Sequence, residues 1–181
     1  MSNEQKNRVE TVQVGIVVER RDSSHPWADH VWMPVACLTG AKPMDPHGDW
    51  RKLDQGEGWS RWLAGTLTIE LHRTETEGYR YNLSGRRPAL YVVMRETDDS
   101  RHERVPLIAT VSPYEAEAYL EGDDIVTAVP LPPELEAWMQ GFIDAHHVDR
   151  PFNKRRRDRA IVEPAPEFPL PPTVRRGSHG R

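Results

Sequence analysis

The chain has 181 residues, a formal net charge of −4 and a hydrophobic content of 37%. This length suits one domain with a single core rather than several domains. No window approaches the ~20 apolar residues of a membrane-spanning helix, and the polar first ten residues lack the apolar stretch of a signal peptide. These features predict a soluble, cytoplasmic protein.

The single cysteine, Cys37, excludes an internal disulfide, and no C-x-x-C pair is present for zinc or redox chemistry. Cys37 lies in an apolar run, where a free cysteine usually behaves as a small buried hydrophobic residue. We therefore expect it to belong to the core and to have no catalytic role.

Charge is distributed unevenly along the chain. Residues 149–181 hold nine Lys/Arg and four Asp/Glu, a net charge of +5, whereas the preceding residues carry −9. An acidic body with a basic end suggests a segment that meets an anionic partner or folds back on its own body. We predict a disordered N-terminus over residues 1–10, an α+β domain over 11–148 and a basic, proline-rich, disordered tail over 149–181.

Alternation of apolar and polar side chains predicts most of the strands. It is clearest over residues 63–72, where one face is expected to carry Leu63, Gly65, Leu67, Ile69 and Leu71. The other expected strands are 12–18, 31–38, 50–53, 79–83, 89–95, 105–111 and 125–129. Because proline cannot donate to a ladder, Pro34 indicates an edge strand or a bulge.

Two helices are expected in the C-terminal half. Ser112, Pro113 and Glu115 form a capping-box pattern that begins a short helix over 113–120. A second helix begins near Pro133 and carries a helical apolar stripe. The stripe consists of Leu135, Trp138, Met139, Phe142 and Ile143. We expect this stripe to pack on a sheet, and the alternative is a partner groove or a dimer seam.

Six to eight short strands joined by hairpin-length loops, with helices near the end, define an α+β fold class. We expect a single, mainly antiparallel β-sheet or an open barrel, with a short helix, a C-terminal amphipathic helix and then the disordered tail. Strand–helix–strand alternation is missing from the pattern, so a doubly wound fold is not expected.

The sequence contains no recognised catalytic motif: G-x-S-x-G, G-x-x-x-x-G-K-[ST] and G-x-G-x-x-G are all absent. His25, Asp29 and His30, in the segment HPWADH, form the only cluster that resembles metal-ligand chemistry, but their spacing matches no zinc or iron signature. The favoured interpretation is a loop fixed over the sheet by Trp27 and Trp32. We therefore predict no catalytic residue, no metal site and no cofactor.

The second helix ends in His146 and His147, where the helix dipole favours a protonated imidazole, and capping or packing is the expected role. A basic run follows at 150–159. It is a candidate for nucleic-acid binding, but the acidic body would repel a duplex, which favours an arm that docks on an acidic protein surface. The predicted partner-binding residues are His146, His147, Arg150, Phe152, Lys154, Arg155, Arg156, Arg157, Arg159, Trp27, Asp29, His30 and Trp32.

Six phrases, read together over residues 14–160, carry a family resemblance. They are VGIVVERR, PWADHVWMPVACL, GEGW, YRYNL, RPALYVVMR and HHVDRPFNKRRRDRA. Together they resemble an uncharacterised bacterial domain-of-unknown-function family of small cytoplasmic proteins, encoded beside molybdenum-containing formate dehydrogenases. The resemblance implies an accessory or assembly role for such an enzyme, with a dehydrogenase subunit or a maturation factor as partner. It assigns no catalytic residue.

Some relatives in that family are labelled molybdenum-cofactor guanylyltransferases, but this sequence lacks the glycine-rich nucleotide loop and the strand–helix alternation that such an enzyme needs. The leading hypothesis is a non-enzymatic accessory protein that acts by binding another protein. Two alternatives stay open: a nucleic-acid or nucleotide binding module that uses residues 150–159, and a small metal or molybdenum-cofactor-related enzyme. The oligomeric state is left open.

Overall fold

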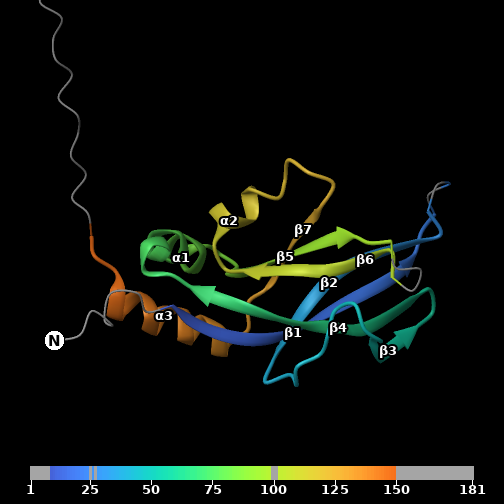
Figure 1. Cartoon of the computed structure of the whole chain (residues 1–181), viewed down its shortest axis with the longest axis horizontal. Helices are drawn as coiled ribbons and strands as arrows, with labels where there is room; N and C mark the ends of the chain where they lie inside the picture. Colours follow the sequence, from blue (N-terminus) through green and yellow to red (C-terminus); the bar gives the residue numbers. More distant parts are fainter. Residues whose placement is uncertain (1–8, 25, 27, 99–101, 150–181) are drawn as a thin grey trace, which may run out of the picture. The chain divides into compact units, whose positions relative to one another are not determined.

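The computed structural model describes residues 9–24, 26, 28–98 and 102–149 (Figure 1). Within them the strands are β1 (Glu10–Asp22), β2 (His30–Thr39), β3 (Arg51–Gly56), β4 (Trp59–Leu71), β5 (Ala89–Glu96), β6 (Arg104–Thr110) and β7 (Ile125–Pro130). The helices are the 3-10 turn η2 (Arg73–Glu75), α1 (Thr76–Ser84), α2 (Pro113–Glu117) and α3 (Pro133–His146). Both ends predicted to be disordered lie largely outside the described residues.

The described strands form two antiparallel sheets, where the sequence led us to expect a single sheet or an open barrel. The first sheet has the order β2-β1-β4-β3 and the second has the order β6-β5-β7. The sheets approach each other where β4 meets β6 and where β2 meets β7. Within the described residues, no hydrogen-bonded ladder joins them at either place, so the arrangement is open. The mainly antiparallel α+β class is confirmed.

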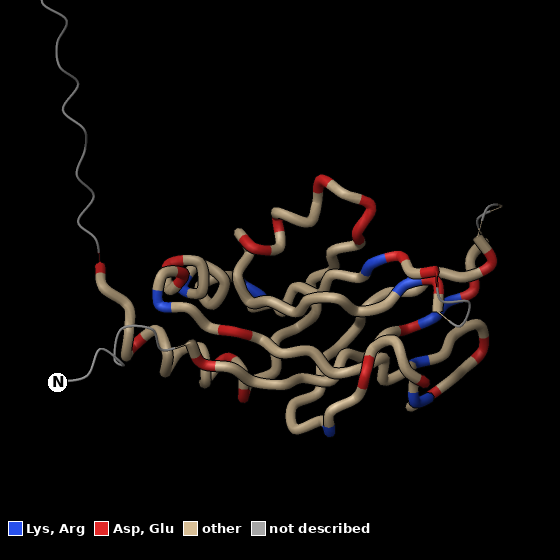
Figure 2. The backbone as a smooth tube through the Cα atoms, viewed as in Figure 1, with Lys and Arg blue, Asp and Glu red and all other residues tan. Residues whose placement is uncertain are grey.

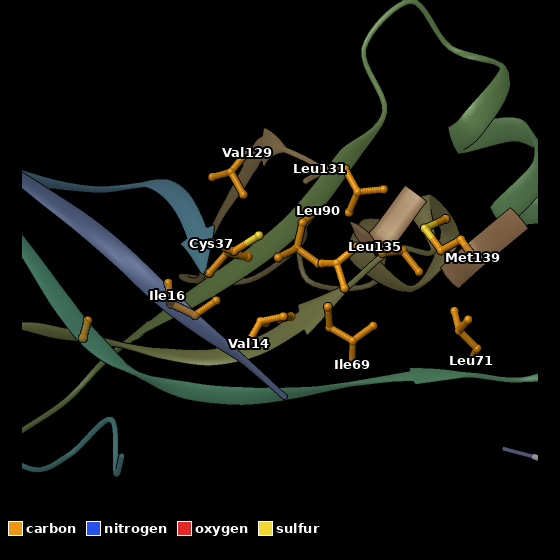
Figure 3. Packing of buried hydrophobic residues seen from close by; sticks show 14 of the residues in the cluster. Val14, Ile16, Cys37, Ile69, Leu71, Leu90, Val129, Leu131, Leu135 and Met139 are labelled. Carbon is orange, nitrogen blue, oxygen red and sulfur yellow. The ribbon is translucent and has the colours of Figure 1, made fainter. Parts of the chain in front are cut away.

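The core lies between the two sheets and is closed at one end by α3. Figure 3 shows Val14 and Ile16 of β1 beside Ile69 of β4, with Leu90 of β5 and Leu135 of α3 close by. All five side chains are at most 2% exposed. Because inward-facing residues recur at every second position of a strand, the apolar positions of the alternating pattern in the sequence are the ones that form the core.

The stripe on α3 packs into this core, as predicted. Leu135, Met139, Phe142 and Ile143 are buried, while Trp138 is partly buried and its indole Nε1 donates a hydrogen bond to Glu10 Oε2 at 3.0 Å. The helix therefore ties the start of β1 to the C-terminal part of the domain. No described helix is both long and apolar enough to pass through a bilayer.

The predicted strand over residues 79–83 is wrong, because this segment belongs to helix α1. Tyr79 is 1% exposed and Tyr81 is 67% exposed, so the apparent alternation does not describe one buried face. The inward positions are Tyr79, Asn82 and Leu83, which have the i, i+3, i+4 spacing of a helix. Asn82 Nδ2 donates to the carbonyls of Ala89 and Val111, both at 2.8 Å. Asn82 is polar although it occupies an inward position of the helix, so the apolar pattern of the sequence did not show the helical period.

The face predicted for Leu63 is wrong, and the reason is a bulge in the first sheet. The ladder between β1 and β4 shifts register between Gly15 and Val17, so Val17 pairs with Leu63. Ala64, and not Leu63, joins the core cluster. Because one extra residue in a strand turns the following side chains to the other face, Leu63 instead contacts the outer side of the first sheet at Gly15.

Gly65, next to this bulge, has a φ of +131°, and a Cβ built there would lie 2.7 Å from Pro46 Cα. We expect Gly65→Ala to lower the free energy of unfolding by about 1–3 kcal/mol, because it forces a rare backbone conformation and a backbone contact. Chemical denaturation measures this loss. Gly141→Ala is the control, since a Cβ there meets no atom within 4 Å, and equal losses in both variants would contradict the explanation.

Two smaller predictions are confirmed. Ser112 caps α2, because its Oγ accepts a hydrogen bond from Glu115 N at 3.4 Å, although the α-helix ends at Glu117 and is shorter than expected. Cys37 is 7% exposed, and burial raises the pKa of its thiol to about 11. Cys37 belongs to the core cluster, as expected.

Candidate functional site

The structure describes five of the predicted partner-binding residues: Asp29, His30, Trp32, His146 and His147. The others lie outside the described residues and stay predictions: Trp27, Arg150, Phe152, Lys154, Arg155, Arg156, Arg157 and Arg159. His25 of the HPWADH segment lies outside them as well. The five described residues fall into two groups, one at the end of α3 and one at the start of β2.

The two histidines at the end of α3 point to different neighbours. His147 approaches α1, with Nδ1 3.0 Å from Thr76 Oγ1 and Nε2 in contact with Arg80. His146 packs edge-on against Phe142, with ring centroids 4.6 Å apart. These contacts fit the packing roles expected for them, and they fix the end of α3 against α1.

At the start of β2, Asp29 is exposed, whereas His30 and Trp32 are half-buried. His30 Nε2 lies 3.0 Å from a terminal nitrogen of Arg20. Trp32 packs against the core and meets Trp50 edge-on at 5.5 Å. In the described part of the chain no group of three His, Cys, Asp or Glu residues is arranged to hold a metal ion.

The outer face of the first sheet, at the same end, brings together charged and aromatic side chains from three strands. Glu19 of β1 lies opposite Met33 of β2 and Arg61 of β4. Two residues on, Arg21 lies opposite Val31 of β2 and Trp59 of β4. Directly opposed residues of an antiparallel pair share a face, so these side chains form one surface. We call the set Arg21, Arg61, Trp59, Val31 and Met33 the arginine face.

Glu19 lies at the centre of the arginine face and is only 4% exposed. Its carboxylate accepts one hydrogen bond from Arg61 Nε at 2.7 Å and another from Arg21 Nε. These hydrogen bonds, the one from Arg61 above all, lower the pKa of Glu19, although burial acts in the opposite direction. Because a buried carboxylate is costly unless it is paired, Glu19 needs both arginines in place.

The two arginines are held at their inner nitrogens and remain accessible at their outer ends. Their side chains are 70% and 45% exposed for Arg21 and Arg61, and both bind Glu19 through Nε. The Arg61 guanidinium also lies over the Trp59 ring, 5.0 Å from its centroid. Among the described residues, the terminal nitrogens of both groups form no hydrogen bond. They can therefore donate hydrogen bonds to a carboxylate or a phosphate in a preset orientation.

An apolar edge borders these cations. Val31 and Met33 are 44% and 48% exposed on β2, an edge strand of the first sheet. Arginine, tryptophan and methionine are enriched at protein interfaces, and here they lie on one face. Figure 2 shows Lys and Arg where β1, β3 and β4 come together, and acidic residues on α2 and the following loop.

The partner-binding residues predicted from the sequence include none of the residues of the arginine face, and they do not include Glu19. The available signal was the period-two spacing of Glu19 with Arg21 and of Trp59 with Arg61. Only the register of β1 against β4, which are separated by about forty residues, joins the two pairs.

This arrangement defines a two-sheet, open α+β protein with a cationic and aromatic surface on one sheet. The chain belongs to a family described as "Protein of unknown function (DUF3305)", whose model matches residues 13–156. The match supports the uncharacterised family expected from the resemblance. No curated protein and no solved structure matches the chain.

Proposed function

We propose that this chain is a non-enzymatic accessory protein that binds another protein through the arginine face. One observation carries the proposal: two accessible arginines are oriented by the buried carboxylate of Glu19, beside an exposed apolar edge. A solitary surface arginine loses side-chain entropy when it binds. Arginines that are already held lose less, so their contacts yield more affinity.

The chemistry of the arginine face favours a partner with acidic side chains next to an apolar contact. Carboxylates pair with guanidinium groups in a planar, bidentate geometry, and Val31 and Met33 can pack against apolar residues beside them. The family resemblance supports a molybdenum-dependent formate dehydrogenase, or a maturation factor of that enzyme, as the partner. The basic run at 150–159 is proposed as a second contact to the same acidic partner.

The test is recovery of formate dehydrogenase activity on the immobilised full-length chain. The variant combines Glu19→Gln, Arg21→Gln and Arg61→Gln, which removes the cations without leaving a buried charge unpaired. We expect at least tenfold less recovered activity, because interface arginines contribute about 2 kcal/mol or more when they are hot spots. The control, which removes the same number of arginines, is Arg86→Gln with Arg87→Gln, at two exposed positions in the turn after α1.

Equal recovery by the triple variant and the control would contradict a role for the arginine face. Failure of the unaltered chain to recover the dehydrogenase would overturn the named partner. Retention of the unaltered chain on DNA or RNA, lost steeply as salt rises and absent in the triple variant, would replace a protein partner with a nucleic acid.

A further inference from the structure

A separate cavity of about 210 Å³ lies between β4, β6 and α2. Its walls come from both sheets at the place where they approach without a shared ladder. The lining residues are Leu67, Thr68, Glu70, His72, Leu107, Ile108, Ala109 and Glu115. None of them belongs to the arginine face or to the predicted partner-binding residues.

The cavity combines an apolar wall with a negative rim. Leu67, Leu107 and Ile108 are partly exposed and supply the wall. Glu70 and Glu115 supply carboxylates from two different elements, and the described lining includes no lysine or arginine. His72 is the one potentially cationic lining residue, with Nε2 3.1 Å from Glu70 Oε2.

The phenol of Tyr79 is buried beside His72, which lines the cavity. Tyr79 is 1% exposed and its oxygen accepts a hydrogen bond from His72 N at 3.0 Å. Burial is the main reason that its pKa rises to about 12, and the carboxylates of Glu75, Glu115 and Glu70 add to that rise. Two of these carboxylates, those of Glu70 and Glu115, line the cavity.

Size and shape indicate what the cavity can hold. Pockets for whole small molecules usually measure about 300–1,000 Å³, so 210 Å³ suits a single long side chain better. Lysine and arginine carry an aliphatic stem that packs on apolar surface and a cationic head that stays polar. The leucine and isoleucine wall matches the stem, and the glutamate rim matches the head. We propose that this cavity binds the side chain of an arginine or lysine presented by a partner protein.

Exposed aromatic surface beside the cavity can support the rest of such a partner. Tyr114 precedes Glu115 on α2 and is 57% exposed. One edge of its ring lies against Gly78 of α1, where a Cβ would stand 3.0 Å from it. Tyrosine is favoured at interfaces because it offers a large, stiff contact surface. This site shares strand β4 with the arginine face but no residue of it, and it does not depend on the function proposed above.

The test is a titration of the isotopically labelled full-length chain, followed by amide chemical shifts. The probes are capped Gly-Arg-Gly and Gly-Lys-Gly peptides, with a capped Gly-citrulline-Gly peptide as the neutral match. We expect both cationic peptides to shift the amide signals of Thr68, His72 and Ile108, with dissociation constants in the millimolar range. The citrulline peptide should bind at least fivefold more weakly, and added salt should weaken the binding of the cationic peptides.

Single substitutions test whether the peptides bind in the cavity. Glu70→Gln and Glu115→Gln should each weaken binding of the arginine peptide several-fold. Glu117→Gln, which lies on α2 with Glu115 but outside the lining, should leave binding unchanged. Dispersed amide spectra establish that each variant is folded. Equal binding of the citrulline peptide, or unchanged binding by both lining variants, would overturn the proposal. Agmatine binding as tightly as the peptide would indicate a free amine ligand instead of a protein side chain.

Discussion

Phe142→Ala is expected to lower the free energy of unfolding by about 3–5 kcal/mol, the range for phenylalanine truncation in a packed core. Phe142 is 2% exposed in the middle of the α3 stripe. Its ring contacts Tyr79 of α1 at a centroid distance of 6.3 Å and His146 at 4.6 Å. Removing it opens a cavity at the place where α3 meets α1, and the surrounding helices can collapse only partly.

Urea denaturation followed by tryptophan fluorescence measures this loss. Because total stability of a domain is about 5–15 kcal/mol, Phe142→Ala can unfold much of the population. Phe142→Leu keeps more of the volume and should cost less than Phe142→Ala. Tyr81→Ala, at a 67% exposed site on α1, is the control and should cost much less. A small loss for Phe142→Ala would mean that α3 is not part of the cooperative core.

The second large effect is expected from removal of both arginines around Glu19. Arg21→Ala with Arg61→Ala leaves a carboxylate that is 4% exposed without either hydrogen-bond donor. Breaking a buried ion pair on one side costs about 3–5 kcal/mol. Because both guanidinium groups are partly solvent-exposed, we expect a loss at or below the lower end of that range, about 2–3 kcal/mol.

Adding Glu19→Gln to this double variant is the informative control. It removes the unpaired charge, so part of the lost free energy of unfolding should return. A double-mutant cycle isolates that coupling. If Glu19→Gln brings no recovery, the loss comes from the arginine stems and their packing on Trp59, and not from the charge.

Acid titration gives an independent check on Glu19. Its folded-state pKa lies below the ordinary value of 4.5 because Arg61 and Arg21 donate hydrogen bonds to the ionised form. A lowered carboxyl pKa contributes stability that is fully present above the unfolded-state pKa and is lost as the pH falls through the folded-state pKa. The stability of the unaltered chain should therefore fall below about pH 4.5 more steeply than that of Glu19→Gln. Parallel pH profiles would contradict the assignment.

Local patterns predicted the elements in which side-chain period and structure agree. Alternation identified β1 and β4, and the i, i+3, i+4 stripe identified α3. Ser112 was found because a capping residue acts within one turn of its own helix. Each of these signals depends on neighbours along the chain, which is why the sequence alone could supply them.

The failures have a common physical cause in contacts between distant segments. The helical period of α1 is masked because Asn82 is buried to bind Ala89 and Val111. Leu63 lies on the face opposite to the one predicted, because a bulge shifts the pairing of β1 with β4. The contact of Asn82 with Val111 and the pairing of β1 with β4 join residues that are too far apart in the chain for a short sequence window to reveal them.

The sequence by itself determined the fold class, most strand and helix positions, the buried state of Cys37 and the stripe of α3, because local period and composition decide them. The tertiary structure decided the division into two sheets, the arginine face around Glu19 and the cavity between β4 and β6. Those features depend on register and on which strand edges meet. Strand pairing brings Glu19 to Arg61 and sheet packing brings Glu70 to Glu115, across separations that no local pattern encodes.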